Sequence, residues 1–341
     1  MTRQPKPIIP IIILTVTLLF VEACEIGTKK IDPISQTLTP MSASVKGTAT
    51  ARAENAGSND TLATAITKAT EQAGFIYGTQ TAVGALNEPS RLATATAIAP
   101  MVAELPRYGV DPAEGYVAWL HDPATIELQG YQQTGYVNDY QQIIAKDFVM
   151  AADITWNTKN SVSGCGFMFR SDGNTNKPNQ YSVVITRVAS GYLAFMAMAD
   201  GKIANFRTFF PKTEDRSFSW FNDATNRLAV VAKGTLLDLY TNGVLIGQVD
   251  TTVPPPSSIP APPVISLPAD ANAQMVQDFA DQTALYGDGI DQINSQLAEA
   301  KRNYGNQPAI FTDGFLGFIS VSQSGTMVCK FENAWLFILD K

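Results

Sequence analysis

The sequence has little histidine, little cysteine and few charged residues. Among its 341 residues there are one histidine and three cysteines, and 16% are Asp, Glu, Lys or Arg. A single imidazole, His121, cannot form the multi-histidine site that catalytic zinc requires. Its neighbour Asp122 would face the opposite way on a strand, so a structural histidine is favoured over an acid–base pair. No Gly-x-Ser-x-Gly sequence of the serine hydrolases occurs either.

Basic clusters are also missing. The formal net charge is −7, and no group of Lys and Arg residues forms a continuous basic segment. Nucleic-acid binding needs a basic face that releases counterions from the phosphates. We therefore expect no nucleic-acid partner.

No apolar run is long enough to cross a bilayer, which takes about 20 residues. A basic start is followed by an apolar-rich stretch from Ile8 to Val21, which fits the hydrophobic region of a signal peptide over residues 1–24. The stretch ends in Val21-Glu22-Ala23-Cys24, which resembles the lipobox of bacterial lipoproteins. The resemblance implies lipidation of Cys24, a membrane anchor and an extracytoplasmic position at the cell envelope.

Glu22 departs from the lipobox, where a small residue is usual. Two alternatives to lipidation therefore stay open. The chain is cut after Ala23 and secreted as a soluble protein, or the N-terminal segment is kept as an uncleaved anchor.

Large apolar side chains are scarce from residue 25 to residue 105, where Thr, Ala, Ser and Gly dominate. Such a composition buries too little apolar surface to offset the entropy of ordering the backbone. We predict a disordered, flexible linker, a stalk between the anchor and a folded domain.

From residue 106 onward, short β-branched and aromatic runs recur between turn residues, which predicts an all-β domain over 106–341. In 147–156, Phe148, Met150 and their alternate neighbours form one apolar face, and Asn242-Gly243 fits a two-residue hairpin turn. The number of strands predicts two packed sheets. The predicted strands are 147–156, 164–170, 180–188, 191–199, 203–210, 227–232, 235–241, 244–250, 314–321 and 326–339.

One segment, 252–310, interrupts the β pattern. A proline-rich run is followed by helical spacing over 270–303, with Gly287 and Gly289 between two apolar stripes. We predict an inserted helical hairpin broken at these glycines. The stiff proline-rich flank favours an insertion that stands off the sandwich or clamps across it.

The cysteines at 165 and 329 remain as an even pair if Cys24 is lipidated. Both lie in apolar alternations, so both are expected to point into a core. A disulfide between them and two separate buried thiols are the two interpretations that the sequence leaves open.

The strand signatures resemble the concanavalin A-like lectin/glucanase sandwich, a two-sheet jelly roll, in its laminin G-like and 3-keto-disaccharide hydrolase-like branches. The resemblance covers 106–341 apart from the insertion. It implies a scaffold that hosts lectins, hydrolases and adhesion modules alike. The signatures are Phe148-Val149-Met150-Ala151-Ala152-Asp153-Ile154, Gly164-Cys165-Gly166-Phe167-Met168-Phe169-Arg170, Gln180-Tyr181-Ser182-Val183-Val184-Ile185, Asn226-Arg227-Leu228-Ala229-Val230-Val231 with Leu239-Tyr240-Thr241-Asn242-Gly243, and Gly314-Phe315-Leu316-Gly317-Phe318 followed by Val328-Cys329-Lys330-Phe331-Glu332-Asn333-Ala334-Trp335.

The catalytic sequence of the glucanases in that family, Glu-x-Asp-x-x-Glu, is absent. Retaining hydrolysis needs two carboxyl groups about 5 Å apart, and no pair at even spacing on a strand supplies them. We therefore predict no catalytic residues. Asp172-Gly173-Asn174 begins like a calcium loop but does not continue as one, because Val183 stands where a Glu would bind, so a polar turn is favoured. No cofactor is predicted, apart from a structural calcium ion elsewhere on the sandwich.

Aromatic residues gather in 206–221, among charged side chains, and aromatic faces of this kind suit sugar rings or peptides. Packing at the edge of the core is the alternative for these rings. The predicted ligand-binding residues are Phe210, Trp220 and Phe221 from this stretch, with Arg170 and Tyr181 on the concave sheet. The resulting hypothesis is an envelope-anchored binding lipoprotein that recognises a glycan or a surface protein. A glycoside-active hydrolase and a structural or assembly module that uses the helical insertion are the alternatives.

Overall fold

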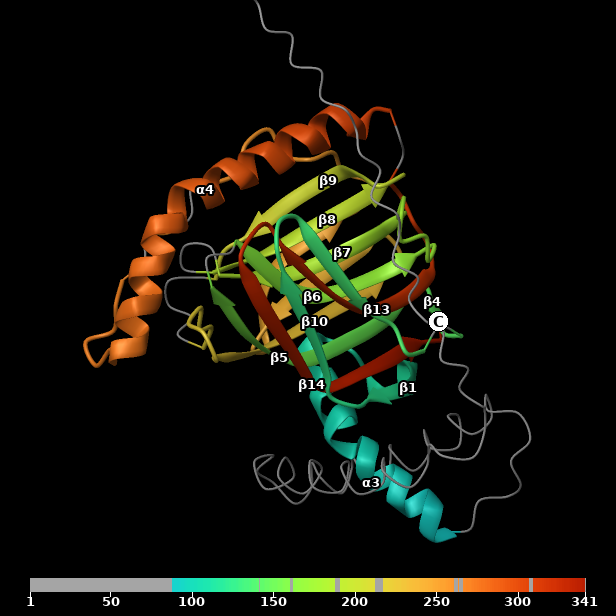
Figure 1. Cartoon of the computed structure of the whole chain (residues 1–341). Helices are drawn as coiled ribbons and strands as arrows, with labels where there is room; N and C mark the ends of the chain where they lie inside the picture. Colours follow the sequence, from blue (N-terminus) through green and yellow to red (C-terminus); the bar gives the residue numbers. More distant parts are fainter. Residues whose placement is uncertain are drawn as a thin grey trace, which may run out of the picture. The chain divides into compact units, whose positions relative to one another are not determined.

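The computed structural model describes residues 88–140, 142–159, 162–187, 191–211, 217–260, 263, 266–306 and 309–340. The predicted signal peptide, Cys24 and residues 25–87 of the predicted linker lie outside the described residues. Figure 1 shows the described part as a β-sandwich with one helix at each outer side.

Two antiparallel sheets of seven strands each form the sandwich. The order in the first, sheet A, is β1-β14-β5-β10-β11-β12, with β2 paired to β14; the order in the second, sheet B, is β3-β13-β6-β7-β8-β9, with β4 paired to β13. The predicted all-β class and two-sheet sandwich are confirmed. Sheet A consists of β1 (Gly115–His121), β2 (Ala124–Gln129), β5 (Phe148–Lys159), β10 (Thr225–Lys233), β11 (Leu236–Thr241), β12 (Val244–Asp250) and β14 (Thr326–Leu339); sheet B consists of β3 (Gln133–Val137), β4 (Ile144–Ala145), β6 (Ser163–Ser171), β7 (Gln180–Thr186), β8 (Tyr192–Ala199), β9 (Lys202–Phe209) and β13 (Gly314–Ser322).

Every strand predicted from the sequence occurs, and β1 to β4 occur in addition. The hairpin between β11 and β12 turns at Asn242 and Gly243, whose φ angles are 50° and 83°. Both residues adopt the positive φ that a two-residue hairpin turn of this kind requires.

The core lies between the sheets. Alternate residues of β5, among them Phe148, Met150 and Trp156, face Phe167 and Phe169 of β6 across it. Cys165 of β6 and Cys329 of β14 form a disulfide with a Cα–Cα distance of 5.9 Å, so the bridge ties sheet B to sheet A through this core.

Helix α3 (Glu88–Glu104) packs on the outer face of sheet A through its residues from Ala95 onward. The short helices η1 (Leu105–Tyr108) and η2 (Pro112–Glu114) follow it. Ile98 and Val102 pack with Val149 and Trp335 of the sheet in a second apolar cluster. Residues 95–104, which the sequence predicted as part of the linker, therefore pack in the folded domain. The sequence does not reveal this packing, because alanine supplies much of the contact and alanine is also common in linkers.

Helix α4 (Ala273–Tyr304) is one continuous helix of 32 residues, where the sequence predicted a helical hairpin. Gly287 lies inside it with open space around the position of a Cβ. A glycine lowers helix stability by about 1 kcal/mol relative to alanine without forbidding the helical conformation, and contacts on both sides of Gly287 hold α4 together.

The helix packs on the outer face of sheet B, at the β8–β9 side (Figure 1). Ile293, Leu297 and Ala300 are buried there against Met196 and Phe206. The predicted insertion thus lies on the sandwich. Neither α3 nor α4 combines the length and the apolar character that a membrane span would need.

Candidate functional site

A groove of about 220 Å³ lies on the outer face of sheet B, along α4. Strands β6, β7, β8 and β13 supply its floor, α4 one wall, and the segments at the start of β3 and after β13 one end. The residues that line it are Gln132, Gln133, Thr134, Tyr136, Val162, Ser163, Gly164, Ser182, Val184, Thr186, Tyr192, Ala194, Met196, Met198, Ile203, Gln292, Gln296, Ile319, Val321, Ser322 and Gln323.

The floor of the groove follows from strand alternation. On β7, Tyr181, Val183 and Ile185 point into the core, so Ser182, Val184 and Thr186 point outward into the groove. Neighbouring strands add Ala194 and Met196 of β8 and Ile319 of β13. The floor is therefore apolar with hydroxyl groups set into it.

Five glutamines line the groove: Gln132, Gln133, Gln292, Gln296 and Gln323. They come from the β3 segment, from α4 and from the turn after β13. The side-chain Nε2 of Gln292 donates to Oε1 of Gln323 at 3.3 Å, which joins the helix to the turn. Gln323 is itself fixed, because its backbone N–H donates to the Val162 carbonyl at 2.9 Å.

Some polar atoms in this lining have no hydrogen-bond partner in the described structure. They are Oγ of Ser163, Oγ1 of Thr186 and Oε1 of Gln292, and all three atoms are buried. Buried polar groups normally have a partner, from the protein, from water or from a ligand. A molecule that enters the groove beside these three buried atoms could supply the missing hydrogen bonds.

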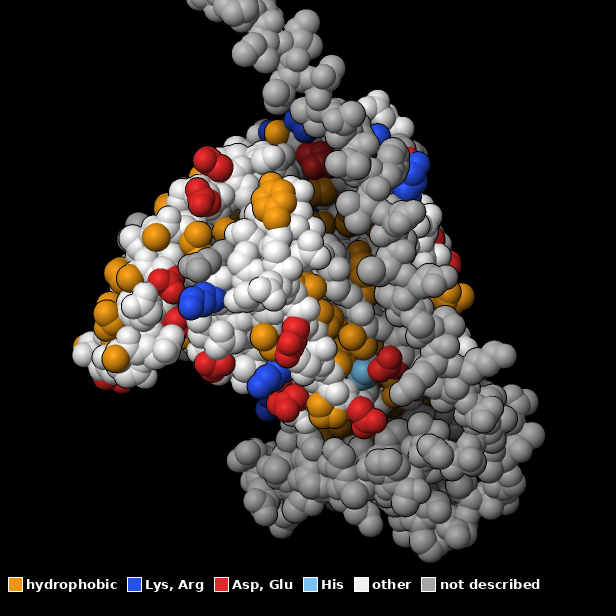
Figure 2. Space-filling model, viewed as in Figure 1, with side chains coloured by type: hydrophobic (Ala, Val, Ile, Leu, Met, Phe, Trp, Pro, Cys, Tyr) orange, Lys and Arg blue, Asp and Glu red, His pale blue; other side chains and the backbone are white. Residues whose placement is uncertain are grey.

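The described residues that line the groove include no Asp, Glu, His, Lys or Arg. Burial raises the pKa of Tyr136 and of Tyr192, so both phenols stay protonated at neutral pH. The groove thus offers neutral donors and acceptors over an apolar floor. On the side of the molecule seen in Figure 2, uncharged and hydrophobic surface predominates over the described part of the sandwich.

A buried network holds the first half of α4 on the sandwich. Arg187, which follows β7, donates from its NH1 nitrogen to Oγ1 of Thr158 and to Oδ1 of Asn222, both at 2.7 Å. Its NH2 nitrogen lies 3.6 Å from Oδ1 of Asp278 in α4. Burial lowers the pKa of Arg187, and the Asp278 carboxylate opposes that shift. Asp278 also accepts from the backbone N–H of Asn222 at 2.9 Å.

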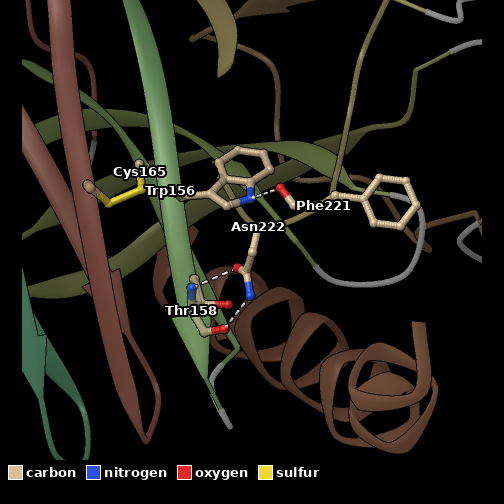
Figure 3. The surroundings of a disulfide bond; sticks show 6 residues. Trp156, Thr158, Cys165, Phe221 and Asn222 are labelled. Carbon is tan, nitrogen blue, oxygen red and sulfur yellow. Dashed lines mark hydrogen bonds between the residues drawn. A yellow bond between two sulfur atoms is a disulfide. The ribbon is translucent and has the colours of Figure 1, made fainter. Parts of the chain in front are cut away.

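Figure 3 shows where this network meets the core. Asn222 faces Thr158 at the end of β5, and the indole N–H of Trp156 donates to the Phe221 carbonyl at 3.0 Å, beside the disulfide. The loop 217–224 is therefore fixed to β5 on one side and to α4 on the other.

Two of the predicted ligand-binding residues are part of the core. Arg170 is 2% exposed, and its guanidinium donates to the carbonyls of Lys146 and Phe311. Tyr181 is fully buried, and its hydroxyl donates to the Ala309 carbonyl at 2.9 Å. The prediction that they line a concave binding face is wrong, because Arg170 and Tyr181 use their polar groups to hold the segment 309–311.

Among its described residues, the aromatic stretch 206–221 contributes no side chain to the lining of the groove. Trp220 is 7% exposed and stacks on Phe221 with ring centroids 4.1 Å apart. Phe210 packs on Tyr192 at 5.6 Å, so it supports a groove residue from behind. Lys212, Glu214, Asp215 and Arg216 of the same stretch lie outside the described residues.

Other candidate residues have local structural partners. Asp172 accepts hydrogen bonds from the backbone N–H of Asn174 at 3.0 Å and from Nδ2 of Asn179 at 2.7 Å, as a polar turn requires. Nδ1 of His121 lies 2.6 Å from the Asp122 carbonyl oxygen, and Nε2 lies 3.4 Å from Oδ2 of Asp139. In the described part of the chain, no three His, Cys, Asp or Glu side chains are grouped so as to hold a metal ion.

A second hollow lies over β2, β14 and β5 of sheet A and contains the carboxylates of Glu127 and Asp223. Asp223 accepts from Nδ2 of Asn157 at 3.0 and 3.1 Å. Glu127 and Asp223 are both exposed, so the lining of this hollow has no buried acid.

The glutamines are not among the binding residues predicted from the sequence. One signal was available: Gln292 and Gln296 are four residues apart and flank Ile293 and Leu297, so they share a helix face next to the apolar stripe. The register that brings Gln132, Gln133 and Gln323 beside them depends on strand pairing between β3 and β13, which the sequence does not reveal.

No family model matches the chain, and no curated protein matches it by sequence. Solved structures are similar to it at low scores. A carbohydrate-binding module from Bacillus subtilis is 13% identical, with a TM-score of 0.34 over 62% of this chain and 94% of that one. The catalytic domain of an endo-1,3-beta-glucanase (laminarinase) from Thermotoga petrophila is 7% identical, with a TM-score of 0.35 over 64% and 77%. Sheep galectin-11 is 10% identical, with a TM-score of 0.25 over 36% and 80%. Because these values are low, function has to be inferred from the groove itself.

Proposed function

We propose that this protein is a lipid-anchored envelope protein whose sandwich binds a neutral glycan in the groove on sheet B. The observation that carries the proposal is the uncharged, amide-rich lining with polar atoms that lack a protein partner. Sugars present arrays of hydroxyl groups on an apolar ring, and amide side chains can donate to one hydroxyl while accepting from the next. Apolar floor residues such as Val184 and Ile319 would take the ring face.

Binding without hydrolysis is the better fit to this lining. Glycoside hydrolysis by the usual route needs a carboxylic acid and a second carboxylate on either side of the scissile bond. The described lining residues include neither. A glycoside-active hydrolase would therefore have to use acids brought from outside the groove.

The anchor is a separate part of the proposal and rests on the N-terminal sequence alone. Lipid on Cys24 would place the sandwich at the membrane surface outside the cytoplasm, where glycans and surface proteins are available. The intact mass of the mature protein tests this part. A mass that includes a lipid-modified Cys24 is expected, and an unmodified N-terminus would contradict it.

A glycan array followed by calorimetric titration of the full-length protein tests the groove. We expect binding to neutral oligosaccharides, with no dependence on charged sugars. A variant that fills the floor, Ala194→Phe, should abolish binding while a change on exposed sheet A surface, Val244→Phe, should leave it intact. Failure to bind any glycan, together with capture of a defined surface protein on the same groove, would favour the protein-recognition alternative.

A further inference from the structure

Helix α4 supplies one wall of the groove with two side chains of the same kind. Gln292 and Gln296 lie one turn apart and face the groove, while Ile293 and Leu297 beside them are buried on sheet B at 3% and 4% exposure. The buried pair fixes the rotation of the helix about its axis. The two side chains therefore line the groove, and both are half-buried there.

The protein satisfies the donor of the Gln292 side-chain amide but not its acceptor. Its Nε2 donates to Gln323 at 3.3 Å, and its Oε1 has no partner in the described structure. Oε1 of Gln292 is buried. A buried acceptor without a partner is unfavourable, and a ligand hydroxyl that entered the groove beside it would supply the missing hydrogen bond. Gln323, its partner, is anchored through its backbone to Val162 and Gln132.

The helix is fixed at both ends. Near its C-terminus, Oε1 of Glu299 accepts from the backbone N–H of Ile203 at 3.1 Å, and Nδ2 of Asn303 donates to the Ile203 carbonyl at 3.0 Å. Near its N-terminus, α4 is attached through the side chain of Asp278, which is 1% exposed. Gln292 and Gln296 lie between these two attachments.

Asp278 has partners from α4 itself, from the loop 217–224 and from the residue that follows β7. It accepts from the backbone N–H and from Nδ2 of Asn222, at 2.9 and 3.1 Å, and from Nε2 of Gln274 at 3.0 Å. The Arg187 guanidinium lies 3.6 Å away. A buried carboxylate with these contacts permits only a narrow range of helix positions.

We propose that α4 is a recognition element of the groove, in which Gln292 and Gln296 contact the ligand and select its hydroxyl pattern, and Asp278 is the residue that positions them. The inference rests on the proposed glycan-binding function of the same groove. In this proposal the inserted helix determines which sugar binds. The sandwich residues alone would bind a sugar ring but would separate different sugars poorly.

Titration of the full-length protein with the neutral oligosaccharides that bind the wild type tests the two amides. Gln296→Ala should weaken binding of the preferred sugar by about tenfold, the loss of roughly one well-made hydrogen bond. Epimers that differ at a single hydroxyl should become less well separated in affinity. Gln277→Ala is the matched control: Gln277 is on the same helix, and its Nε2 donates to Asp281 on the exposed side.

Hydrogen exchange of Asp278→Asn tests the positioning role independently of any ligand. Exchange should rise across the first half of α4, residues 273–290, with the strands of sheet B unchanged, and affinity should fall with loss of discrimination between epimers. Asp278→Glu keeps the negative charge opposite Arg187. It should restore part of the protection of α4 from exchange and part of the binding affinity and epimer discrimination. A merely structural role for Asp278 would raise exchange without altering the epimer preference.

Three results would overturn the inference, and they are distinguishable. If the wild type binds sugars and Gln296→Ala binds the same set with unchanged affinities, the groove works without the helix, and the proposed function survives. If Asp278→Asn leaves exchange in α4 unchanged, Asp278 does not position the helix. If the wild type binds no neutral glycan, the proposed function falls and the inference falls with it.

Discussion

Arg227 of β10 holds Glu104 at the end of α3 through a two-pronged ion pair. Its NH2 nitrogen donates to Oε2 at 2.7 Å, and its Nε donates to Oε1. On its other side, NH1 of Arg227 donates to Oδ1 of Asp153 at 2.7 Å. Tyr108 donates its hydroxyl to Glu104 at 2.6 Å, so a buried network fastens the N-terminal helix to the outer face of sheet A.

Replacement of Arg227 by methionine should destabilise the domain by about 3 kcal/mol, because Glu104 and Asp153 would be left buried without their cation. Chemical denaturation of wild type and variant measures the difference. The control is Lys233→Met, which removes an exposed pair with Glu114 at 3.4 Å and should cost less than about 1 kcal/mol. Equal effects of the two substitutions would show that the α3 contact adds nothing to stability.

The disulfide between Cys165 and Cys329 closes a loop with a sequence separation of 164. In the chain-entropy model a loop of this length contributes about 5 kcal/mol, by restricting the unfolded chain. The double variant Cys165→Ala/Cys329→Ala should therefore unfold at much lower denaturant concentration than the wild type. Either single substitution should cost about as much as the double one, since each already breaks the bridge; a small effect of the single variants would contradict the entropic account.

Strands β5 to β14 could be predicted from the sequence, but β1 to β4 and the way the helices cover the sheets could not. Strand β5 shows why. Its inward residues, such as Phe148 and Met150, alternate with Val149 and Ala151, and the sequence predicts one buried face. Val149 and Ala151 are nonetheless fully buried, because α3 covers the outer face of sheet A. The alternation of residues along a strand predicts which face of the sheet a side chain is on. It does not predict whether a segment distant in sequence covers that face.

The site was missed for the same reason. Aromatic and charged residues were expected to bind ligand, and Arg170 and Tyr181 are instead used inside the protein to hold the segment 309–311. The groove is built where α4 crosses sheet B, from glutamines that are unremarkable in sequence. Only the tertiary contact between α4 and β9 makes Gln292 and Gln296 neighbours of Gln323.

Stability should decrease above about pH 10, the ordinary pKa of tyrosine. Burial raises the pKa of Tyr108 and of Tyr192 in the folded state, so the folded protein resists loss of these protons. A raised pKa in the folded state contributes stability that is present below the unfolded pKa and is lost as the pH rises towards the folded one. Thermal unfolding between pH 8 and 11.5 should show this decline.

Removal of a buried phenol provides the control for the alkaline decline. Tyr192→Phe cannot ionise at this position, so its melting temperature should fall less steeply above pH 10 than that of the wild type. Tyr131→Phe, at a position that is 65% exposed, should follow the wild-type curve. A parallel decline in all three proteins would mean that other groups cause the alkaline loss.

Because α4 is one continuous helix, replacing Gly287 by alanine should change stability in the opposite direction from replacing Gly234. Gly287 lies inside the helix, and an added Cβ there would meet nothing within 4 Å. Gly287→Ala should therefore stabilise the protein by up to about 1 kcal/mol, the difference in helix propensity, and slow hydrogen exchange in α4. Gly234 also has open space, but its φ of +58° is left-handed, so Gly234→Ala should destabilise by about 1 kcal/mol. If residues 273–304 instead formed two helices with a turn at Gly287, alanine there would be destabilising too, and the sign of its effect decides between a single helix and a hairpin.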